Sequence, residues 1–171
     1  MQDKEQIFLD LIRNNNDCIY RIIWSFAKAK ADREDLYQNI LLKVWNNIEK
    51  FKHESKTTTW LYRVVMNTCI DFSRKQKKGY PIIRNQIDTL YIDGEIDIEL
   101  EYIESEKLSL LHHSIQSLST IEKTLITLFL EDLKYSEIGK IVGISERNVA
   151  VKISRIKKKI TRMISKDGNT G

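Results

Sequence analysis

Only one proline, Pro81, interrupts the 171 residues of this chain, and only six glycines accompany it. Because these two residues are the strongest breakers of regular structure, their scarcity leaves long stretches free to form helices. Apolar residues recur at spacings of three and four, and β-branched residues do not form the alternating runs that strands show. The sequence therefore predicts an all-α protein.

The N-terminal part of the chain contains several amphipathic helical patterns. Asp32 is placed to cap the second of them, with Asp35 in the capping-box position. The polar run 51–59 predicts a loop before the third, and the residues from Asn14 to Asp17 weaken the first pattern enough to allow a break. We expect these helices at 4–29, 33–48 and 59–76.

A second helical unit is predicted toward the C-terminus. Ser119 or Thr120 is placed to cap a helix that contains Leu125 to Leu130, and the tail 166–171 is expected to be disordered. The helices expected here lie at 107–117, 120–130, 135–142 and 146–164.

Acidic and basic residues are distributed unevenly along the chain. Eight acidic residues and no basic residue lie between Asp88 and Glu106, whereas ten basic and two acidic residues lie between Lys134 and Lys166. The acidic stretch has few large apolar residues to offset the entropy of ordering, so we expect a flexible linker. The predicted organisation is two small helical domains, 1–78 and 107–171, joined by an acidic linker at 79–106.

Several classes of site and location are disfavoured by the sequence. Cys18 and Cys69 are far apart and lie in apolar helical patterns, so we expect buried thiols and no metal site. The chain shows neither a signal-peptide pattern nor an apolar run near the ~20 residues of a membrane span. We therefore expect a cytoplasmic protein without membrane insertion, cofactor or catalytic residues.

The segment from Tyr135 to Lys159 has the pattern of a helix-turn-helix. Gly143 tolerates the positive φ that the turn requires, and Gly139 is small enough to let the two helices approach. Ile144 follows as a core residue, and Ser145 is placed to cap the second helix.

The second of these helices has a polar and basic outer face. A helix of this kind fits the major groove, where Asn and Arg bond base edges and Lys bonds phosphates. A solvated basic face on a helical hairpin is the alternative interpretation. The outward residues are Arg147, Asn148, Ala150, Val151, Lys152, Ser154, Arg155 and Lys157 to Lys159.

Three blocks of sequence together resemble the extracytoplasmic-function subfamily of bacterial RNA polymerase sigma factors. The segment from Ser117 to Arg155 resembles sigma region 4, and the segment from Asp32 to Trp45 resembles region 2.2. The run from Thr59 to Asp71 resembles regions 2.3 and 2.4. The blocks occur in the order and at the spacing of the family, and the resemblance covers about 130 residues.

The resemblance implies partners for the N-terminal domain. Its second helix would dock on the β′ clamp helices of core RNA polymerase, while region 4 would meet the β flap and an anti-sigma factor would be a further partner. Packing in the core is the alternative role for Leu42 and Trp45. The residues implied at the polymerase interface are Asp32, Asp35, Gln38, Asn39, Leu42 and Trp45.

The resemblance also implies how promoter DNA is read. The 146–159 helix would read the double-stranded −35 element through Arg147, Asn148, Ala150, Val151, Lys152, Ser154 and Arg155. The 51–74 loop and helix would read and melt the −10 element, holding the melted strand. Many relatives have aromatic residues where this chain has Thr57 and Thr58, and a threonine cannot stack a base. The implied −10 residues are Ser55, Lys56, Thr57, Thr58, Trp60, Arg63, Asn67, Asp71 and Arg74.

Three other classes of protein are alternatives to this interpretation. An enzyme is disfavoured because the sequence has no metal-binding, phosphate-binding or hydrolytic motif in a fitting context. A stand-alone helix-turn-helix regulator would share the C-terminal half but would lack the block from Asp32 to Trp45. A pure interaction module would have no use for the basic helix.

Overall fold

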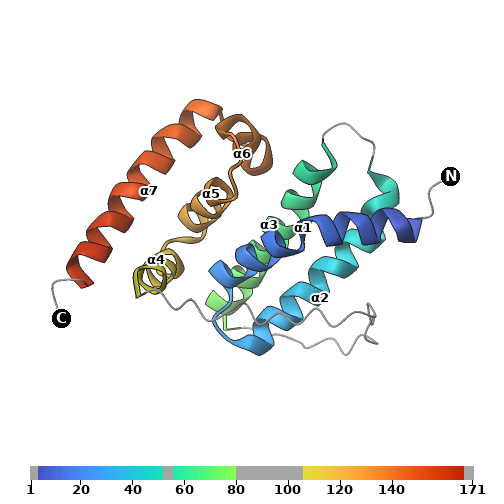
Figure 1. Ribbon diagram of the computed structural model, residues 1–171, viewed down its shortest axis with the longest axis horizontal. Helices are drawn as coiled ribbons and strands as arrows, with labels where there is room; N and C mark the ends of the chain where they lie inside the picture. The colour runs from blue at the N-terminus through green and yellow to red at the C-terminus, as the bar shows by residue number, and fades with distance from the viewer. Residues whose placement is uncertain (1–3, 52–55, 80–105, 168–171) are drawn as a thin grey trace.

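The computed structural model describes residues 4–51, 56–79 and 106–167. All regular elements in these ranges are helical, as predicted (Figure 1). The elements in chain order are α1 (Lys4–Phe26), α2 (Lys30–Asn47), the short 3-10 helix η1 (Ile48–Lys50), α3 (Thr57–Lys77), α4 (Glu106–Gln116), α5 (Thr120–Leu130), α6 (Tyr135–Val142) and α7 (Glu146–Asp167).

Helices α1, α2 and α3 pack on one another and form what we call the N-terminal bundle. Each helix turns one apolar stripe toward the other two, as the spacing of its apolar residues requires. Isoleucines dominate the contribution of α1, and Cys69 of α3 is completely buried, as expected. The fully buried side chains at the centre are Ile19, Ile22, Ile23, Ile40, Val44, Leu61, Val65 and Met66.

Helices α4 to α7 form what we call the C-terminal unit. Helix α7 packs against α4, α5 and α6, and these three lie between α7 and the N-terminal bundle (Figure 1). Leu125 and Leu128 of α5, Ile138 of α6 and Ile153 of α7 are fully buried at its centre. The two units touch along α1 and α3 on one side and α4, α5 and α6 on the other.

Several element boundaries differ from the sequence-based predictions. Helix α1 runs unbroken through Asn14 to Asp17, because Leu11, Ile12, Cys18 and Ile19 on either side of that stretch are buried. It ends at Phe26 rather than at residue 29.

The prediction that Asp32 caps α2 was wrong. The helix begins at Lys30 with Ala29 as its N-cap and no side-chain cap, so Asp32 lies inside the first turn. A carboxylate is still favourable there, since the N-terminus of a helix carries partial positive charge.

The ends of α3 and α7 also differ from the predictions. Thr57 and Thr58, expected in a loop, form the first turn of α3. Helix α7 continues to Asp167, so the first residues of the expected disordered tail are helical. The predicted linker lies almost wholly outside the described residues.

Candidate nucleic-acid interface

Helices α6 and α7 meet in a tight helix-turn-helix, built as the sequence predicted. Gly143 ends α6 in the left-handed conformation, with φ of 82°. The amides of Gly143 and Ile144 both donate to the carbonyl of Gly139, at 2.8 and 3.1 Å. A Cβ on Gly139 would lie 2.5 Å from the carbonyl oxygen of Ile144, so only glycine fits there.

The second helix of the motif is capped and oriented by local contacts. The amide of Asn148 donates to Oγ of Ser145 at 3.2 Å, which satisfies one of the free amides at the helix start. Val149, Ile153, Ile156 and Ile160 bury one face of α7.

The residues predicted to read the −35 element lie together on the opposite face of α7. Most of them are exposed, and only Ala150 is half-buried. Val151 is a large apolar side chain held 43% exposed, which suits contact with a thymine methyl. The exposed members are Arg147, Asn148, Val151, Lys152, Ser154 and Arg155.

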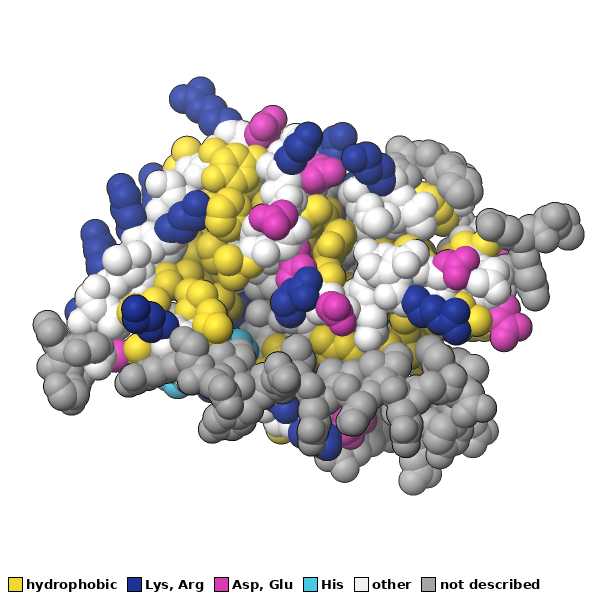
Figure 2. All heavy atoms as spheres, in the orientation of Figure 1, with side chains coloured by type: hydrophobic (Ala, Val, Ile, Leu, Met, Phe, Trp, Pro, Cys, Tyr) yellow, Lys and Arg dark blue, Asp and Glu magenta, His cyan; other side chains and the backbone are white. Residues whose placement is uncertain are grey.

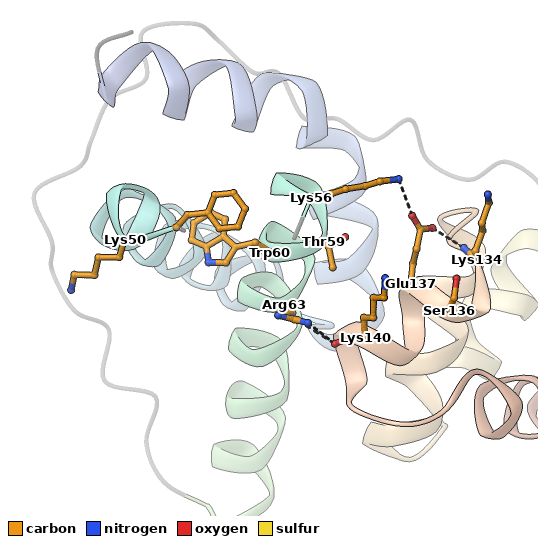
Figure 3. A pocket seen from close by; sticks show the side chains of 10 residues that line it. Lys50, Lys56, Thr59, Trp60, Arg63, Lys134, Ser136, Glu137 and Lys140 are labelled. Atoms are coloured by element: carbon orange, nitrogen blue, oxygen red, sulfur yellow. Dashed lines mark hydrogen bonds and ion pairs between the residues drawn. The ribbon is translucent and has the colours of Figure 1, made fainter. Parts of the chain in front are cut away.

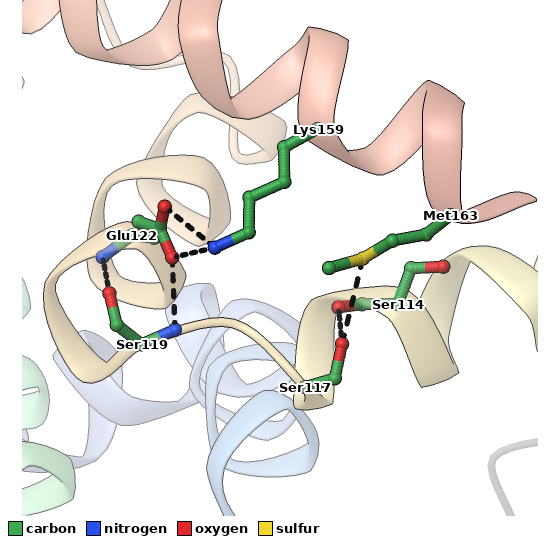
Figure 4. Close-up of polar contacts among 6 residues, drawn as sticks. All are labelled: Ser114, Ser117, Ser119, Glu122, Lys159 and Met163. Carbon is green, nitrogen blue, oxygen red and sulfur yellow. Dashed lines mark hydrogen bonds and ion pairs between the residues drawn. The ribbon is translucent and has the colours of Figure 1, made fainter.

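The three consecutive lysines at the centre of α7 have different surroundings. Lys157 lies over the ring of Phe129, at 3.9 Å from its centroid. Lys159 bonds both carboxylate oxygens of Glu122, at 3.0 and 2.9 Å (Figure 4). Lys158 is exposed and has no ion-pair partner among the described residues. Of the three, Lys158 is therefore the one available to a phosphate.

Glu122 joins α7 to the start of α5. Its carboxylate accepts from the amide of Ser119 at 3.1 Å, and Oγ of Ser119 accepts from the amide of Glu122 at 3.3 Å (Figure 4). This reciprocal capping box confirms Ser119, rather than Thr120, as the cap of α5. The Lys159 ammonium, together with the Ser119 bonds, lowers the pKa of the Glu122 carboxyl below its ordinary value.

The residues predicted to read the −10 element lie along α3 and at its start, and they do not form one open surface. Asn67 and Arg74 are exposed, while Asp71 is held by Arg74 at 2.8 Å and by Lys43 of α2 at 3.8 Å. Ser55 lies outside the described residues.

Three other −10 candidates, Lys56, Trp60 and Arg63, line a cavity of about 700 Å³ between the N-terminal bundle and α6, whereas Thr57 and Thr58 are not among its lining residues (Figure 3). Trp60 is half-buried there, with its ring centroid 5.4 Å from that of Phe51. The guanidinium of Arg63 donates twice to the carbonyl oxygen of Lys140, at 3.2 and 2.8 Å. The lining residues are Lys50, Phe51, Lys56, Thr59, Trp60, Arg63, Lys134, Ser136, Glu137 and Lys140.

Sequence reasoning did not anticipate the α6 side of this cavity. Glu137 pairs with Lys56 at 3.6 Å and accepts from the amide of Lys134 at 3.0 Å. The amide of Lys134, and then the Lys56 ammonium, lower the pKa of the Glu137 carboxyl. The Lys56–Glu137 pair joins residues about eighty positions apart, and no periodicity or local motif predicts it.

The predicted polymerase-binding residues of α2 separate into two groups. Gln38 and Asn39 are exposed, and Asp32, Asp35 and Leu42 are half-buried. Trp45 packs edge-on against Phe8 of α1 at 5.3 Å and carries the Lys4 ammonium over its ring at 4.4 Å.

The described residues were also compared with the requirements of membrane spans and metal sites. None of their helices is both long and apolar enough to cross a bilayer. No group of three or more potential metal ligands occurs among them.

Comparison with known proteins places both halves of the chain in one family. Residues 11–79 match Sigma-70 region 2, and residues 108–160 match Sigma-70 region 4. The sequence is 28% identical to the RNA polymerase sigma factor SigV of Bacillus subtilis, over 97% of this chain and 96% of that protein. It is 26% identical to the ECF RNA polymerase sigma factor SigM of Bacillus subtilis, over 88% and 91%.

Solved structures share the fold at lower sequence identity. CnrH, in a complex with the cytosolic domain of CnrY, gives a TM-score of 0.69 at 17% identity, over 95% of this chain and 90% of that one. The sigma factor RpoE of Bartonella quintana, in a complex with the anti-sigma factor NepR, gives 0.65 at 18% identity, over 91% and 97%. The two matched regions, in this order and over most of the chain, show that it belongs to the extracytoplasmic-function sigma factors, which direct bacterial RNA polymerase to promoters.

Proposed function

We propose that this chain binds core RNA polymerase and selects promoters through two separate elements, with α7 reading the −35 element and the 51–74 segment reading the −10 element. The observation that carries the −35 assignment is the exposed polar and basic face of α7, presented by a capped helix-turn-helix. Such a helix enters the major groove with its N-terminal half nearest the base edges.

Residues on α7 have distinct proposed roles. Arg147, Asn148 and Arg155 carry the side chains that bond guanine and adenine edges, and Ser154 lies on the same exposed face. Ala150 and Val151 are placed to contact thymine methyls, and Lys152 a phosphate.

The −10 assignment rests on the basic and aromatic residues at the start of α3. Lys56, Arg63 and Arg74 supply positive charge for the DNA backbone, and Trp60 supplies an aromatic ring. Thr57 and Thr58 lie in the first helical turn, where a hydroxyl can bond a base but cannot stack on it.

The polymerase-binding surface is proposed on α2. Gln38 and Asn39 present amides to solvent beside the half-buried carboxylates of Asp32 and Asp35. Amides and carboxylates suit a partner helix bearing arginine. Since Trp45 is engaged with Phe8 and Lys4, its contribution is to hold α2 on α1.

An anti-sigma factor and the β flap are the proposed protein partners of the C-terminal unit. Figure 2 shows a broad hydrophobic area on this unit. Leu108, Ile121 and Leu130 are large apolar side chains exposed by 52, 64 and 49%, and apolar exposure of this kind marks protein-binding surfaces. The place of action would be the cytoplasm, and RNA synthesis itself would belong to the polymerase.

Run-off transcription with core polymerase on a randomised promoter library tests the proposal. We expect transcripts only when the chain is added, with two enriched elements upstream of the start. Asn148→Ala should relax selection in the −35 element alone, because each bidentate base contact is worth about 1–3 kcal/mol of discrimination. Arg13→Ala, which removes an exposed charge from α1, is the matched control and should leave both elements unchanged.

Two results would count against the sigma-factor reading of these surfaces. One is tight, specific DNA binding by the chain alone with no effect of core polymerase, which is the behaviour of a stand-alone regulator. The other is full activity after Arg147, Lys152 and Arg155 are neutralised together, which is the behaviour of an interaction module.

A further inference from the structure

The cavity between the N-terminal bundle and α6 carries more positive than negative charge. Glu137 is the only acidic side chain among the described residues that line it, and its carboxylate already pairs with Lys56 at 3.6 Å. Like charges around one cavity repel each other, and an anion from solution would relieve that repulsion. The lining cations nearest α6 are Lys56, Arg63, Lys134 and Lys140 (Figure 3).

Several hydrogen-bond donors of these cations are not used within the protein. Lys134 and Lys140 are exposed, and neither has an ion-pair partner among the described residues. Arg63 uses Nε and Nη2 on the carbonyl oxygen of Lys140, so about three of the five N–H donors of its guanidinium remain. Ammonium and guanidinium groups form strong charge-assisted bonds with phosphate oxygens. The cavity can therefore hold an anion that carries several phosphate oxygens.

A pair of aromatic side chains also lines this cavity. The ring centroids of Phe51 and Trp60 are 5.4 Å apart, and both residues are half-buried. Trp60 lies on the side of the cavity away from the lysines of α6 (Figure 3). Aromatic side chains in such positions stack nucleic-acid bases of any sequence. A ligand that fits both sides combines a flat aromatic ring with several negative charges.

The size of the cavity and the groups between its two sides restrict the ligand further. A volume of about 700 Å³ lies within the range of ~300–1,000 Å³ that small-molecule sites have. Thr59 lies between Trp60 and Glu137 (Figure 3). The hydroxyls of Thr59 and Ser136 and the carboxylate of Glu137 suit the hydroxyl groups of a sugar. A base, a sugar and phosphates in this order make a nucleotide.

We infer that this cavity binds a nucleoside polyphosphate, with the base on the Phe51–Trp60 pair and the phosphates among the cations nearest α6. A nucleotide with two or more phosphates is preferred, because a single phosphate would leave most of those cations without a counter-charge. Such a ligand goes beyond promoter reading, since Lys134, Ser136 and Lys140 have no proposed contact with DNA.

Melted DNA is the other ligand that combines bases with phosphates. Its proposed contacts in this region, Lys56, Trp60 and Arg63, all belong to α3 and its N-cap. A nucleotide in the cavity would also contact Lys134 and Lys140, on the opposite wall. Substitutions on α6 therefore distinguish a nucleotide site from the proposed DNA surface.

Titration calorimetry of the full chain tests the site, with ATP, GTP, AMP and inorganic tripolyphosphate as probes. We expect ATP or GTP to bind about tenfold more tightly than AMP, which has fewer charges, and than tripolyphosphate, which has no base. The affinity should fall as salt is added, because the phosphates are bound by ionic contacts. Absence of binding by both triphosphates, or equally tight binding of tripolyphosphate, overturns the inference.

Two substitutions beside α6 and a matched control locate the site. Lys134→Ala and Lys140→Ala each remove an exposed cation and should weaken ATP binding by about tenfold. Lys30→Ala removes an exposed cation from the first residue of α2, at the far end of that helix from the cavity, and should leave ATP binding unchanged. Parental ATP binding in both α6 variants would place the ligand elsewhere and overturn the inference.

Substitution of Trp60 tests the placement of the base. Trp60→Leu should weaken the binding of ATP but not that of tripolyphosphate, whereas Trp60→Phe keeps a ring and should retain ATP binding. Tryptophan fluorescence of the parent should change as ATP binds, and the change should disappear in Trp60→Phe, although Trp24 and Trp45 remain. A change that persists in Trp60→Phe, or ATP binding that is unaffected by Trp60→Leu, overturns this placement.

A single-stranded −10 oligonucleotide separates this inference from the proposed function. In the complex with core polymerase, its affinity should be the same for the parent, Lys134→Ala and Lys140→Ala. Loss of ATP binding in these variants with parental oligonucleotide binding supports a separate nucleotide site. Equal loss of both ligands would assign α6 to the DNA surface and overturn the nucleotide site. ATP binding by a chain that fails to bind the oligonucleotide would overturn only the −10 assignment.

Discussion

Two glycines determine the geometry of the helix-turn-helix. At Gly139 the limit is space, since a Cβ would lie 2.5 Å from the carbonyl oxygen of Ile144. At Gly143 the limit is conformation, since φ is 82° while nothing lies within 4 Å of a Cβ there. The same residue type is thus required for two different physical reasons.

Alanine substitutions distinguish these two reasons. Gly139→Ala should lower the free energy of unfolding by about 1–3 kcal/mol, because a backbone atom must move. Gly143→Ala should cost about 1–2 kcal/mol, the penalty of a left-handed residue. Urea unfolding of the full chain measures both. Only Gly139→Ala should also weaken −35 binding, because it displaces α7, and equal DNA binding by the two variants would contradict this account.

Glu122 makes part of the stability of the C-terminal unit depend on pH. Because the folded pKa of its carboxyl is lowered, the stabilising contribution is complete above the ordinary glutamate pKa and is lost as the pH falls through the lowered one. Glu122→Gln should cost about 1 kcal/mol at neutral pH, a value that allows for the partial exposure of Lys159. Denaturation at about pH 3 should show a smaller difference between the two proteins. A difference that stays constant with pH would rule out the carboxylate as its source.

At the scale of elements, helix type and most boundaries follow from patterns along the chain. The bounds of α6 are those predicted, because Gly143 and the capping of both helices are local signals. The start of α2 was misplaced, because Asp32 looks like a cap in sequence whereas the chain enters the helix at Lys30. The position of an N-cap depends on where the preceding helix ends, and the sequence around the cap does not give that end point.

On the basic face of α7, the sequence pattern does not show which lysines are already engaged by neighbouring side chains. Three lysines in a row look equivalent, yet Lys157 lies on an aromatic ring, Lys159 is held by Glu122 and Lys158 is exposed. Helical geometry sends consecutive residues in directions about 100° apart, so their surroundings must differ.

Alanine substitutions of neighbouring lysines form a matched pair of tests. In the complex with core polymerase, Lys158→Ala should reduce the salt dependence of promoter binding by about one unit of slope, because one phosphate contact is lost. Lys159→Ala should leave that slope unchanged and lower the stability of the C-terminal unit. Filter binding over a salt series and thermal unfolding give the two readouts. Reversed results would place Lys159 on the DNA.

At the scale of the whole molecule, the buried apolar residues of both units form one connected cluster. The ion pair between Arg21 of α1 and Glu131, at 2.7 Å, and the contacts of Arg63 add polar connections between them. Cooperative unfolding is expected when the parts of a small protein share a core.

Calorimetry tests this cooperativity. The parent should unfold in one transition with a ratio of calorimetric to van't Hoff enthalpy of ~1. Arg21→Glu should raise that ratio or divide the transition, because the two units then unfold separately. Glu49→Gln, which breaks the Lys4–Glu49 pair within the N-terminal bundle, should keep a single transition. Two transitions in the parent would mean that the contact between the units is too weak to couple them.

The sequence by itself determined the helical class, the two regions in their order, the helix-turn-helix and the exposed face of α7. Each of these depends on neighbours within about one or two helical turns, where spacing alone decides which side chains share a face. Only the tertiary structure decided which cations remain free, and that residues of both units line one cavity. Arg21 and Glu131 lie 110 positions apart, and their meeting depends on how two formed units fit together. That fit depends on the complete surfaces of both units, so no local sequence pattern predicts it.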